Sequence, residues 1–194
     1  MIDSYQNKSD EQLMEGIKIG EMRAFDELYS RYSKRLLHFF FRMLRKDAEK
    51  AQDFLQDIFL KIVEKPYLFD CKKRFSTWVF TVANNMCKNE YRRLQVRQNG
   101  SIYVGDFNTT ENDIVLPKIE QQIDNQHFKK MVVGELATMS EAKRSVFLLR
   151  YQEQFSIKEI SEILNCSEGT VKSRLFYTTK ALAQKLQAYN PSML

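Results

Sequence analysis

The chain of 194 residues contains few residues that break helices, with only 6 glycines and 3 prolines. Because glycine and proline interrupt helical patterns, their scarcity favours a mostly helical protein. No apolar run approaches the roughly 20 residues that a membrane-spanning helix needs. The opening stretch MIDSYQNKSDEQ lacks the basic start and apolar core of a signal peptide. We therefore expect a cytoplasmic protein with no membrane insertion.

Residues suited to metal binding and acid–base chemistry are also scarce. Cys71, Cys87 and Cys166 are odd in number and far apart, with no CxxC pair, which favours free thiols. Only two histidines are present, and there is no Gly-rich phosphate loop, HExxH motif or nucleophile elbow. We expect no enzymatic activity, no cofactor and no bound metal.

Charge is unevenly distributed along the chain. The formal net charge is +5, from 30 Lys and Arg against 25 Asp and Glu. Residues 1–96 carry a net charge of +4, residues 97–125 carry −3, and residues 126–194 carry +4. Glycines, a proline and a polar run interrupt helical periodicity in the acidic stretch. This organisation predicts two basic helical domains, 1–96 and 126–194, joined by a flexible linker, 97–125, and it favours a polyanionic partner.

The segment SIKEISEILNCSEGTVKSRLFYTTKALA, residues 156–183, predicts two helices joined by a tight turn. Ser156 and Glu159 have the spacing of a capping box at a helix start. Apolar residues at helical spacing follow, and Asn165 tolerates the left-handed conformation that ends helices. Ser167 can cap the second helix. The pattern is typical of a helix-turn-helix.

The second of these helices begins with polar and cationic side chains. They are Ser167, Glu168, Thr170, Lys172, Ser173 and Arg174. Such groups at a helix start can read base edges in the major groove and contact phosphates. The same spacing also fits an ordinary helical hairpin with a solvated charged face.

Residues 47–64, DAEKAQDFLQDIFLKIVE, predict an amphipathic helix. Its expected buried stripe consists of Ala48, Ala51, Leu55, Ile58, Ile62 and Val63. At about 100° per residue, the opposite face carries Asp53, Gln56, Asp57, Leu60 and Glu64. A leucine among carboxylates fits a docking surface for a basic partner with an apolar contact. A solvated acidic face with one stray leucine is the alternative.

A basic loop and a second polar helix follow. The loop carries Lys72, Lys73 and Arg74, and Ser76 can cap the helix. One side of this helix mixes an aromatic residue, amides and cations: Trp78, Thr81, Asn84, Asn85, Lys88, Asn89 and Arg92, with Arg93 adjacent. Aromatic rings stack on bases, amides pair with base edges and cations neutralise phosphates. The pattern predicts a surface for unpaired or partly opened nucleic acid, although Trp78 alone also fits core packing.

Two stretches of the chain resemble one family. EGTVKSRL resembles the recognition helix of the sigma-4 domain of extracytoplasmic-function sigma factors, the small bacterial promoter-recognition subunits. DAEKAQDFLQDIFLKIVEK followed by RFSTWVFTVANNMCKNEYRR resembles the sigma-2 domain of the same family. The resemblance covers roughly residues 25–93 and 133–186 in family order. It implies an all-α chain with a sigma-2-like domain, a linker and a sigma-4-like domain.

The resemblance also implies roles for the surfaces described above. It implies that Asp53, Gln56 and Asp57, with Leu60 beside them, dock on the clamp coiled coil of core RNA polymerase. The loop of residues 72–75, which ends at Phe75, and the helix of residues 78–93 are implied to open and hold the −10 promoter element. The second helix of the helix-turn-helix is implied to contact the −35 element. The linker either threads the channel used by nascent RNA or is a plain spacer.

We therefore expect an alternative RNA polymerase sigma factor that recognises −10 and −35 elements in double-stranded and locally melted promoter DNA. Because no sensor domain is recognisable, an anti-sigma factor is the expected external control. A free-standing helix-turn-helix regulator is the alternative, and a pure interaction protein is a third possibility. A regulator should bind its operator unaided, whereas a sigma factor should bind promoters tightly only with core polymerase.

Overall fold

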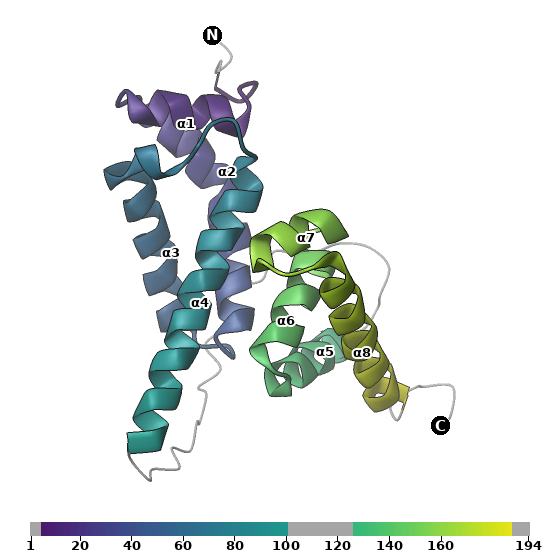
Figure 1. Cartoon of the computed structure of the whole chain (residues 1–194). Coiled ribbons are helices and arrows are strands. Elements are labelled where there is room, and N and C mark those ends of the chain that lie inside the picture. Colours follow the sequence, from purple (N-terminus) through teal and green to yellow (C-terminus); the bar gives the residue numbers. More distant parts are fainter. Residues whose placement is uncertain (1–4, 101–125, 188–194) are drawn as a thin grey trace.

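The computed structural model describes residues 5–100 and 126–187, and all regular elements within these ranges are helical (Figure 1). The first half contains α1 (Asp10–Lys18), α2 (Met22–Met43), α3 (Ala48–Glu64), the 3₁₀ turn η1 (Pro66–Leu68) and α4 (Phe75–Gly100). The second half contains α5 (Gln126–Thr138), α6 (Glu141–Phe147), the π-helical turn η2 (Leu148–Gln152), α7 (Ile157–Leu164) and α8 (Glu168–Gln187). The all-α prediction is confirmed for this part of the chain.

Aromatic side chains form the centre of the first half. Phe39 and Phe40 of α2 are fully buried. The ring of Phe39 meets Phe80 of α4 edge-on at 5.4 Å, and Phe40 meets Phe54 of α3 at 5.5 Å between ring centroids. Edge-to-face pairs add to the stabilisation from burial. The core therefore joins α2, α3 and α4, and α1 lies across one end of them (Figure 1).

The buried stripe of α3 differs in part from the prediction. Phe54 and Phe59 are buried, whereas Leu55 is half-buried and Val63 is exposed. Val63 lies about 100° around the helix from the buried Ile62, at the edge of the face that packs on α2. The buried face of α3 is therefore turned around the helix axis relative to the predicted one, and Val63 belongs to the exposed surface.

Helix α4 begins and ends differently from the prediction. It starts at Phe75, before the predicted cap Ser76. Phe75 is buried and its backbone N–H donates to Glu11 Oε1 at 3.0 Å, which satisfies one of the amide groups left free at a helix start. The helix continues to Gly100, so residues 97–100 of the predicted linker are helical. The remainder, 101–125, and its predicted path through polymerase lie outside the described residues.

The predicted helix-turn-helix is confirmed. Ser156 Oγ accepts from the backbone N–H of Glu159 at 3.2 Å, and the Glu159 carboxylate accepts from the Ser156 N–H at 2.9 Å. Asn165 is left-handed, with φ 49° and ψ 57°. Ser167 Oγ accepts from the N–H of Thr170 at 3.1 Å. The inward residues of the second helix, α8, are Val171, Leu175 and Leu182.

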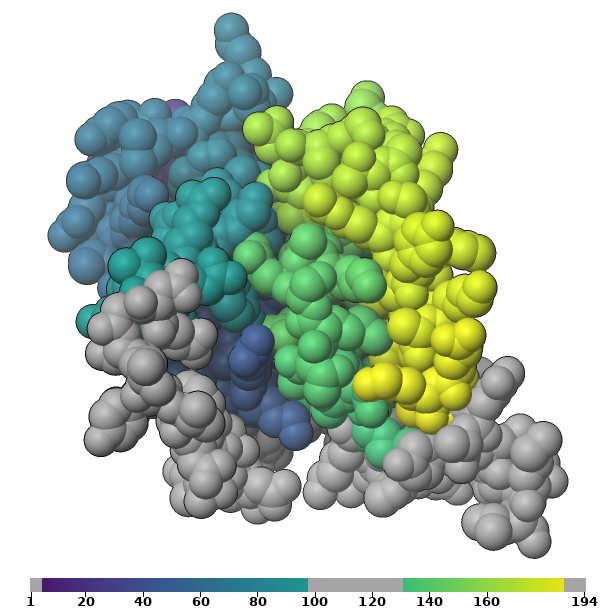
Figure 2. All heavy atoms as spheres, turned by 60° about the horizontal axis from the view of Figure 1, so that its bottom comes forward, coloured from purple at the N-terminus to yellow at the C-terminus, as the bar shows by residue number. Residues whose placement is uncertain are grey.

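The two halves pack against each other. Helix α7 lies beside α4, and α6 contacts α2 (Figure 1). The view in Figure 2 shows α6 directly against α4, with α8 on the far side of α6. The second half therefore covers part of α4, whereas α8 lies on the side turned away from α4.

Candidate nucleic-acid and polymerase interfaces

The first turns of α8 form an open surface. Ser167, Glu168, Lys172 and Ser173 are exposed, and Thr170 is half-buried. The three hydroxyl groups already bond within the turn: Ser167 Oγ and Thr170 Oγ1 lie 2.9 Å apart, and Ser173 Oγ donates to the Thr170 carbonyl at 3.0 Å. These hydroxyls are therefore held in place, with lone pairs left to accept from a ligand.

The two cations of this surface lie on opposite flanks of the helix. Lys172 and Arg174 are each about 100° from Ser173, in opposite directions. Lys172 is exposed and Arg174 is half-buried. Neither side chain is in an ion pair with a described residue. A helix placed in a groove with Ser173 toward its floor would direct the two cations to opposite walls.

An exposed aromatic pair follows one turn later. Phe176 and Tyr177 are 60% and 59% exposed, and their rings meet edge-on at 5.4 Å. The sequence prediction assigned them no role. The sequence could have indicated their exposure, because both aromatics lie between the inward-facing positions Leu175 and Thr178. Apolar side chains on such a helix can contact thymine methyl groups.

The residues proposed from sequence on α4 fall into three groups. Phe75 and Asn84 are buried, at 0% and 1% exposure. The half-buried residues are Trp78, Thr81 and Lys88, and the exposed ones are Asn85, Arg92 and Arg93. Trp78 packs on Phe69 and Phe75 at 5.3 and 5.7 Å between ring centroids. The alternative of core packing for Trp78 therefore has structural support, and Phe75 does not face solvent.

Exposed cations lie near both ends of α4. Lys72, Lys73 and Arg74 are exposed on the loop before it. Arg92 and Arg93 are exposed near its far end, where Arg93 pairs with Glu90 at 2.6 Å. Thr81 Oγ1 donates to the Thr77 carbonyl of its own helix at 2.8 Å. The structure thus brings the cations to the surface but not all of the proposed base-contacting groups.

The acidic face of α3 is exposed as predicted. It carries Asp53, Gln56, Asp57 and Leu60, the last of these 55% exposed. Neither carboxylate is in an ion pair with a described residue. The exposed side chains of Val63 and Tyr67, which the sequence prediction did not include, lie beyond Leu60 along the chain. The surface therefore offers both negative charge and apolar area.

Among residues 5–100 and 126–187, no cluster of His, Cys, Asp and Glu has the geometry of a metal site. No helix in the described ranges is both long and apolar enough to span a bilayer. A helix-turn-helix on one half, with a cationic helix and an exposed acidic face on the other, is typical of helical DNA-binding transcription proteins.

Sequence comparisons identify the family. Residues 28–97 match sigma-70 region 2, and residues 130–182 match sigma-70 region 4. The sequence is 30% identical to the ECF RNA polymerase sigma factor SigL of Mycobacterium tuberculosis, over 89% of this chain and 94% of SigL. It is 29% identical to the RNA polymerase sigma-H factor of Pseudomonas aeruginosa, over 93% of this chain and 95% of that protein.

Solved structures share the fold. CnrH, in complex with the cytosolic domain of CnrY, is 20% identical with a TM-score of 0.67, over 94% of this chain and all of CnrH. The sigma factor RpoE of Bartonella quintana, in complex with the anti-sigma factor NepR, is 23% identical with a TM-score of 0.65. That match covers 84% of this chain and 96% of RpoE.

The chain belongs to the extracytoplasmic-function (ECF) sigma factors of the sigma-70 family. It is an alternative RNA polymerase sigma factor, which directs transcription from promoters. This confirms the resemblance seen in the sequence. The region 2 match on the first half favours this function over that of a free-standing regulator.

Proposed function

We propose that α8 reads the −35 element, with Lys172 and Arg174 as its main contacts. Their positions on opposite flanks of an exposed helix start support this assignment. An arginine can pair bidentately with guanine, whereas a lysine contacts phosphate as a point charge. Ser167, Glu168, Thr170 and Ser173 complete the surface, since they lie on the same open turns.

The −10 element is assigned to α4 and the loop before it. The exposed cations at both ends of this helix can follow a DNA strand along it. Asn85 is exposed between them, and Trp78, Thr81 and Lys88 are partly accessible. Phe75 is packed in the core, so its part in this surface is to support the basic loop. Asn84 can take part only if its surroundings open.

Core polymerase is the proposed partner of the acidic face of α3. The observation that carries the proposal is the exposure of Asp53, Asp57 and Leu60 on one stripe, on a chain that also presents a cationic helix start on α8. The first surface suits a basic protein and the second suits DNA. One chain can therefore join polymerase to a promoter.

Three further aspects complete the proposal. The chain acts by positioning polymerase and carries no catalytic activity of its own, in keeping with a sequence that lacks catalytic motifs. It acts in the cytoplasm, where polymerase and promoter DNA are found.

Its control comes from an anti-sigma factor, a type of partner present in the similar RpoE–NepR structure. Residues 1–96 and 126–194 are the proposed functional domains, with 97–125 between them.

Reconstituted holoenzyme tests this proposal. Promoter binding should require core polymerase, and it should weaken when either the α3 face or the α8 cations are altered. Altering α3 should weaken holoenzyme formation, whereas altering α8 should leave holoenzyme formation intact and affect only the binding of holoenzyme to promoters. Equal promoter affinity with and without polymerase would contradict the proposal.

A further inference from the structure

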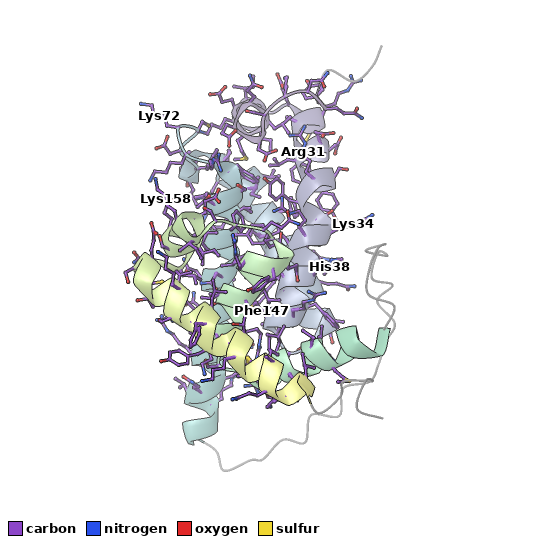
Figure 3. All side chains as sticks on the ribbon, turned by 90° about the vertical axis from the view of Figure 1, so that its right-hand side faces the viewer. Arg31, Lys34, His38, Lys72, Phe147 and Lys158 are labelled. Atoms are coloured by element: carbon purple, nitrogen blue, oxygen red, sulfur yellow. The ribbon has the colours of Figure 1, made fainter. Side chains whose placement is uncertain are left out.

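The basic loop between η1 and α4, residues 70–74, runs beside α1 (Figure 1). Its three cations, Lys72, Lys73 and Arg74, are all exposed, and Figure 3 shows Lys72 projecting away from the molecule. Adjacent like charges repel one another, and a loop loses conformational freedom when it is fixed in one shape. The shape of this loop therefore depends on contacts with other parts of the chain.

The start of the basic loop is held by Lys18, at the end of α1. Lys18 Nζ donates to the Phe69 carbonyl at 3.0 Å and to Cys71 Sγ at 3.1 Å. The Phe69 ring is buried and meets the buried ring of Phe75 edge-on, with 5.4 Å between the centroids. The residue that precedes the loop is therefore fixed through both its side chain and its backbone.

The end of the basic loop is held by Glu11, in the first turn of α1. The backbone N–H of Phe75 donates to Glu11 Oε1 at 3.0 Å. Arg74 is the residue before α4, and its side chain has only donors, so it cannot accept from the free amides of the helix start. Glu11, which lies 64 residues earlier in the chain, supplies the acceptor. Its negative charge is also favourably placed at a helix N-terminus.

The charge of Glu11 is of the wrong sign for a direct contact with DNA. Burial by itself raises the pKa of Glu11, but the hydrogen bond from the Phe75 N–H and the positive charge of Arg74 help to lower it below its ordinary value of 4.5. Glu11 is therefore a carboxylate at neutral pH, and it repels phosphates that approach the basic loop. A benefit to DNA binding can come only from its hold on the loop.

Helix α1 is itself fixed to the first half of the chain. Leu13 and Met14 are fully buried. The Asp10 carboxylate accepts from Arg31 Nη1 of α2 at 2.8 Å and from the Tyr32 hydroxyl. Because the two anchors of the loop are seven residues apart, they lie about two turns apart on one face of α1. One rigid helix thus holds both ends of the basic loop.

We propose that Glu11 and Lys18 are positioning residues for promoter recognition, which fix the basic loop in the shape in which it meets DNA. The inference rests on the assignment of this loop to the −10 element made above. Neither residue contacts DNA, and both act through the three cations of the loop. A loop that is already ordered in the free chain avoids the cost of ordering when it binds. Loss of either anchor therefore weakens binding to the opened −10 strand.

Hydrogen exchange of the full chain, without DNA or polymerase, tests whether α1 holds the loop. Glu11→Ala and Lys18→Met each remove one anchor. The amides of residues 69–76 should exchange about two- to tenfold faster in either variant, the effect of one lost hydrogen bond. Exchange in α2 and α3 should stay at the wild-type rate. Glu11→Gln keeps an oxygen that can accept from the Phe75 N–H, so its loop should exchange like that of the wild type.

Two matched controls are available at exposed positions. Glu15→Ala removes a carboxylate from the same helix as Glu11, and Lys34→Met removes a cation from α2. Neither Glu15 nor Lys34 is in an ion pair with a described residue. In the view of Figure 3, Lys34 lies on the opposite side of the first half from Lys72. Both controls should leave the exchange of the loop unchanged.

Binding of reconstituted holoenzyme to DNA supplies the functional readout. The probe is a promoter fragment from a start site that depends on the wild-type chain, with mismatches that keep its −10 region open. Its affinity should fall in Glu11→Ala and Lys18→Met by about the factor by which loop exchange rises. The salt slope should not change, because no phosphate contact is lost. Glu11→Gln should bind at least as tightly as the wild type. A purely electrostatic role for Glu11 predicts the opposite sign, since removing a carboxylate near DNA strengthens binding.

Unchanged loop exchange in both Glu11→Ala and Lys18→Met would overturn the inference, as would tighter DNA binding by Glu11→Ala. Replacement of Lys72, Lys73 and Arg74 by glutamine separates these failures from failure of the −10 assignment. If this triple variant bound the open fragment as tightly as the wild type, the assignment would fail and the inference with it. If the triple variant bound weakly while Glu11→Ala and Lys18→Met bound normally, only the role of α1 would be contradicted.

Discussion

Buried polar side chains show how differently single residues are accommodated in this protein. Thr178 is fully buried and donates to the Arg174 carbonyl at 2.7 Å. Arg144 is equally buried, and its guanidinium is surrounded by oxygen acceptors. Asn84 has no such partner among the described residues. Since native proteins satisfy most buried polar groups, Asn84 is the residue whose burial needs a reason other than stability.

Replacing this amide should stabilise the free chain. Asn84→Leu has a similar shape and removes a desolvated polar group, so the free energy of unfolding should rise by about 1 kcal/mol. Chemical denaturation of the free protein measures this. Asn84→Asp, which would bury a charge without a partner, should instead lower stability. If Asn84→Leu unfolded more easily than the wild type, the Asn84 amide would have to form hydrogen bonds in the folded chain, which would contradict this account.

The two α8 cations should divide the work of promoter recognition. One of Lys172→Ala and Arg174→Ala should relax base preference at one −35 position, at a cost of roughly 1–3 kcal/mol for the preferred base. The other should weaken binding to all promoters and lower the salt slope by about one unit. Holoenzyme binding to −35 variants at several salt concentrations separates these effects. Lys61→Ala, on α3, is the control for loss of a surface charge.

At the scale of single elements, α3 has one face for the core and one for a partner. Its buried face, which includes Ile58 and Phe59, packs on α2. Asp53 and Asp57 lie on the exposed face without ion pairs to described residues. Surface substitutions away from specific contacts usually change stability by less than about 0.5 kcal/mol. Function on this face can therefore be altered without unfolding the helix.

Changing both Asp53 and Asp57 to alanine should weaken binding to core polymerase because it removes negative charge from the docking face. Co-purification with core polymerase measures the binding, and thermal unfolding should be unchanged. A double variant of Asp26 and Glu162, which are exposed elsewhere, is the control for net charge. Recovery of core polymerase at the wild-type yield would contradict the assignment of α3.

Helix α7 depends on a carboxylate at its start. Burial by itself raises the pKa of Glu159, but hydrogen bonds from Ser156 and Arg74 outweigh burial and lower it below its ordinary value of 4.5. A carboxylate with a lowered pKa stabilises the fold above the unfolded pKa, and this is lost as pH falls through the folded pKa. Glu159→Gln should therefore reduce stability at neutral pH by about 0.5–1 kcal/mol, as loss of part of a cap does.

Unfolding measured across a pH series tests this dependence. The difference between Glu159→Gln and the wild type should vanish once the pH is below the folded pKa. A difference that stayed constant into strong acid would mean that the charge of Glu159 contributes nothing to α7.

At the scale of the whole molecule, local features were predictable and long-range packing was not. The cap at Ser156 and the left-handed Asn165 depend on neighbouring residues, so the sequence was sufficient to place them. The exposed stripe of α3 followed from helical periodicity. The family could be inferred because two separate motifs occur in one order along the chain.

The relation between the halves has no local signal. Arg144 lies 101 residues from Met43, whose carbonyl it binds, and nothing in its surrounding sequence marks it as buried. The same packing buries Asn84, which helical periodicity had placed on an outer face with Asn85. Helical periodicity predicts the buried face of a helix that packs against a single core. Helix α4 packs against the core of its own half on one side and against the other half of the chain on a second side.

The most direct test of the account is transcription in vitro with mapped start sites. Genomic DNA fragments are transcribed with core polymerase alone, with core polymerase and the wild-type chain, and with core polymerase and the Asp53/Asp57 double variant. The account predicts discrete starts only with the wild-type chain, preceded by two shared sequence elements, and their loss with the double variant. Contradiction would come from starts that do not depend on the chain, or from a chain that selects the same fragments without polymerase.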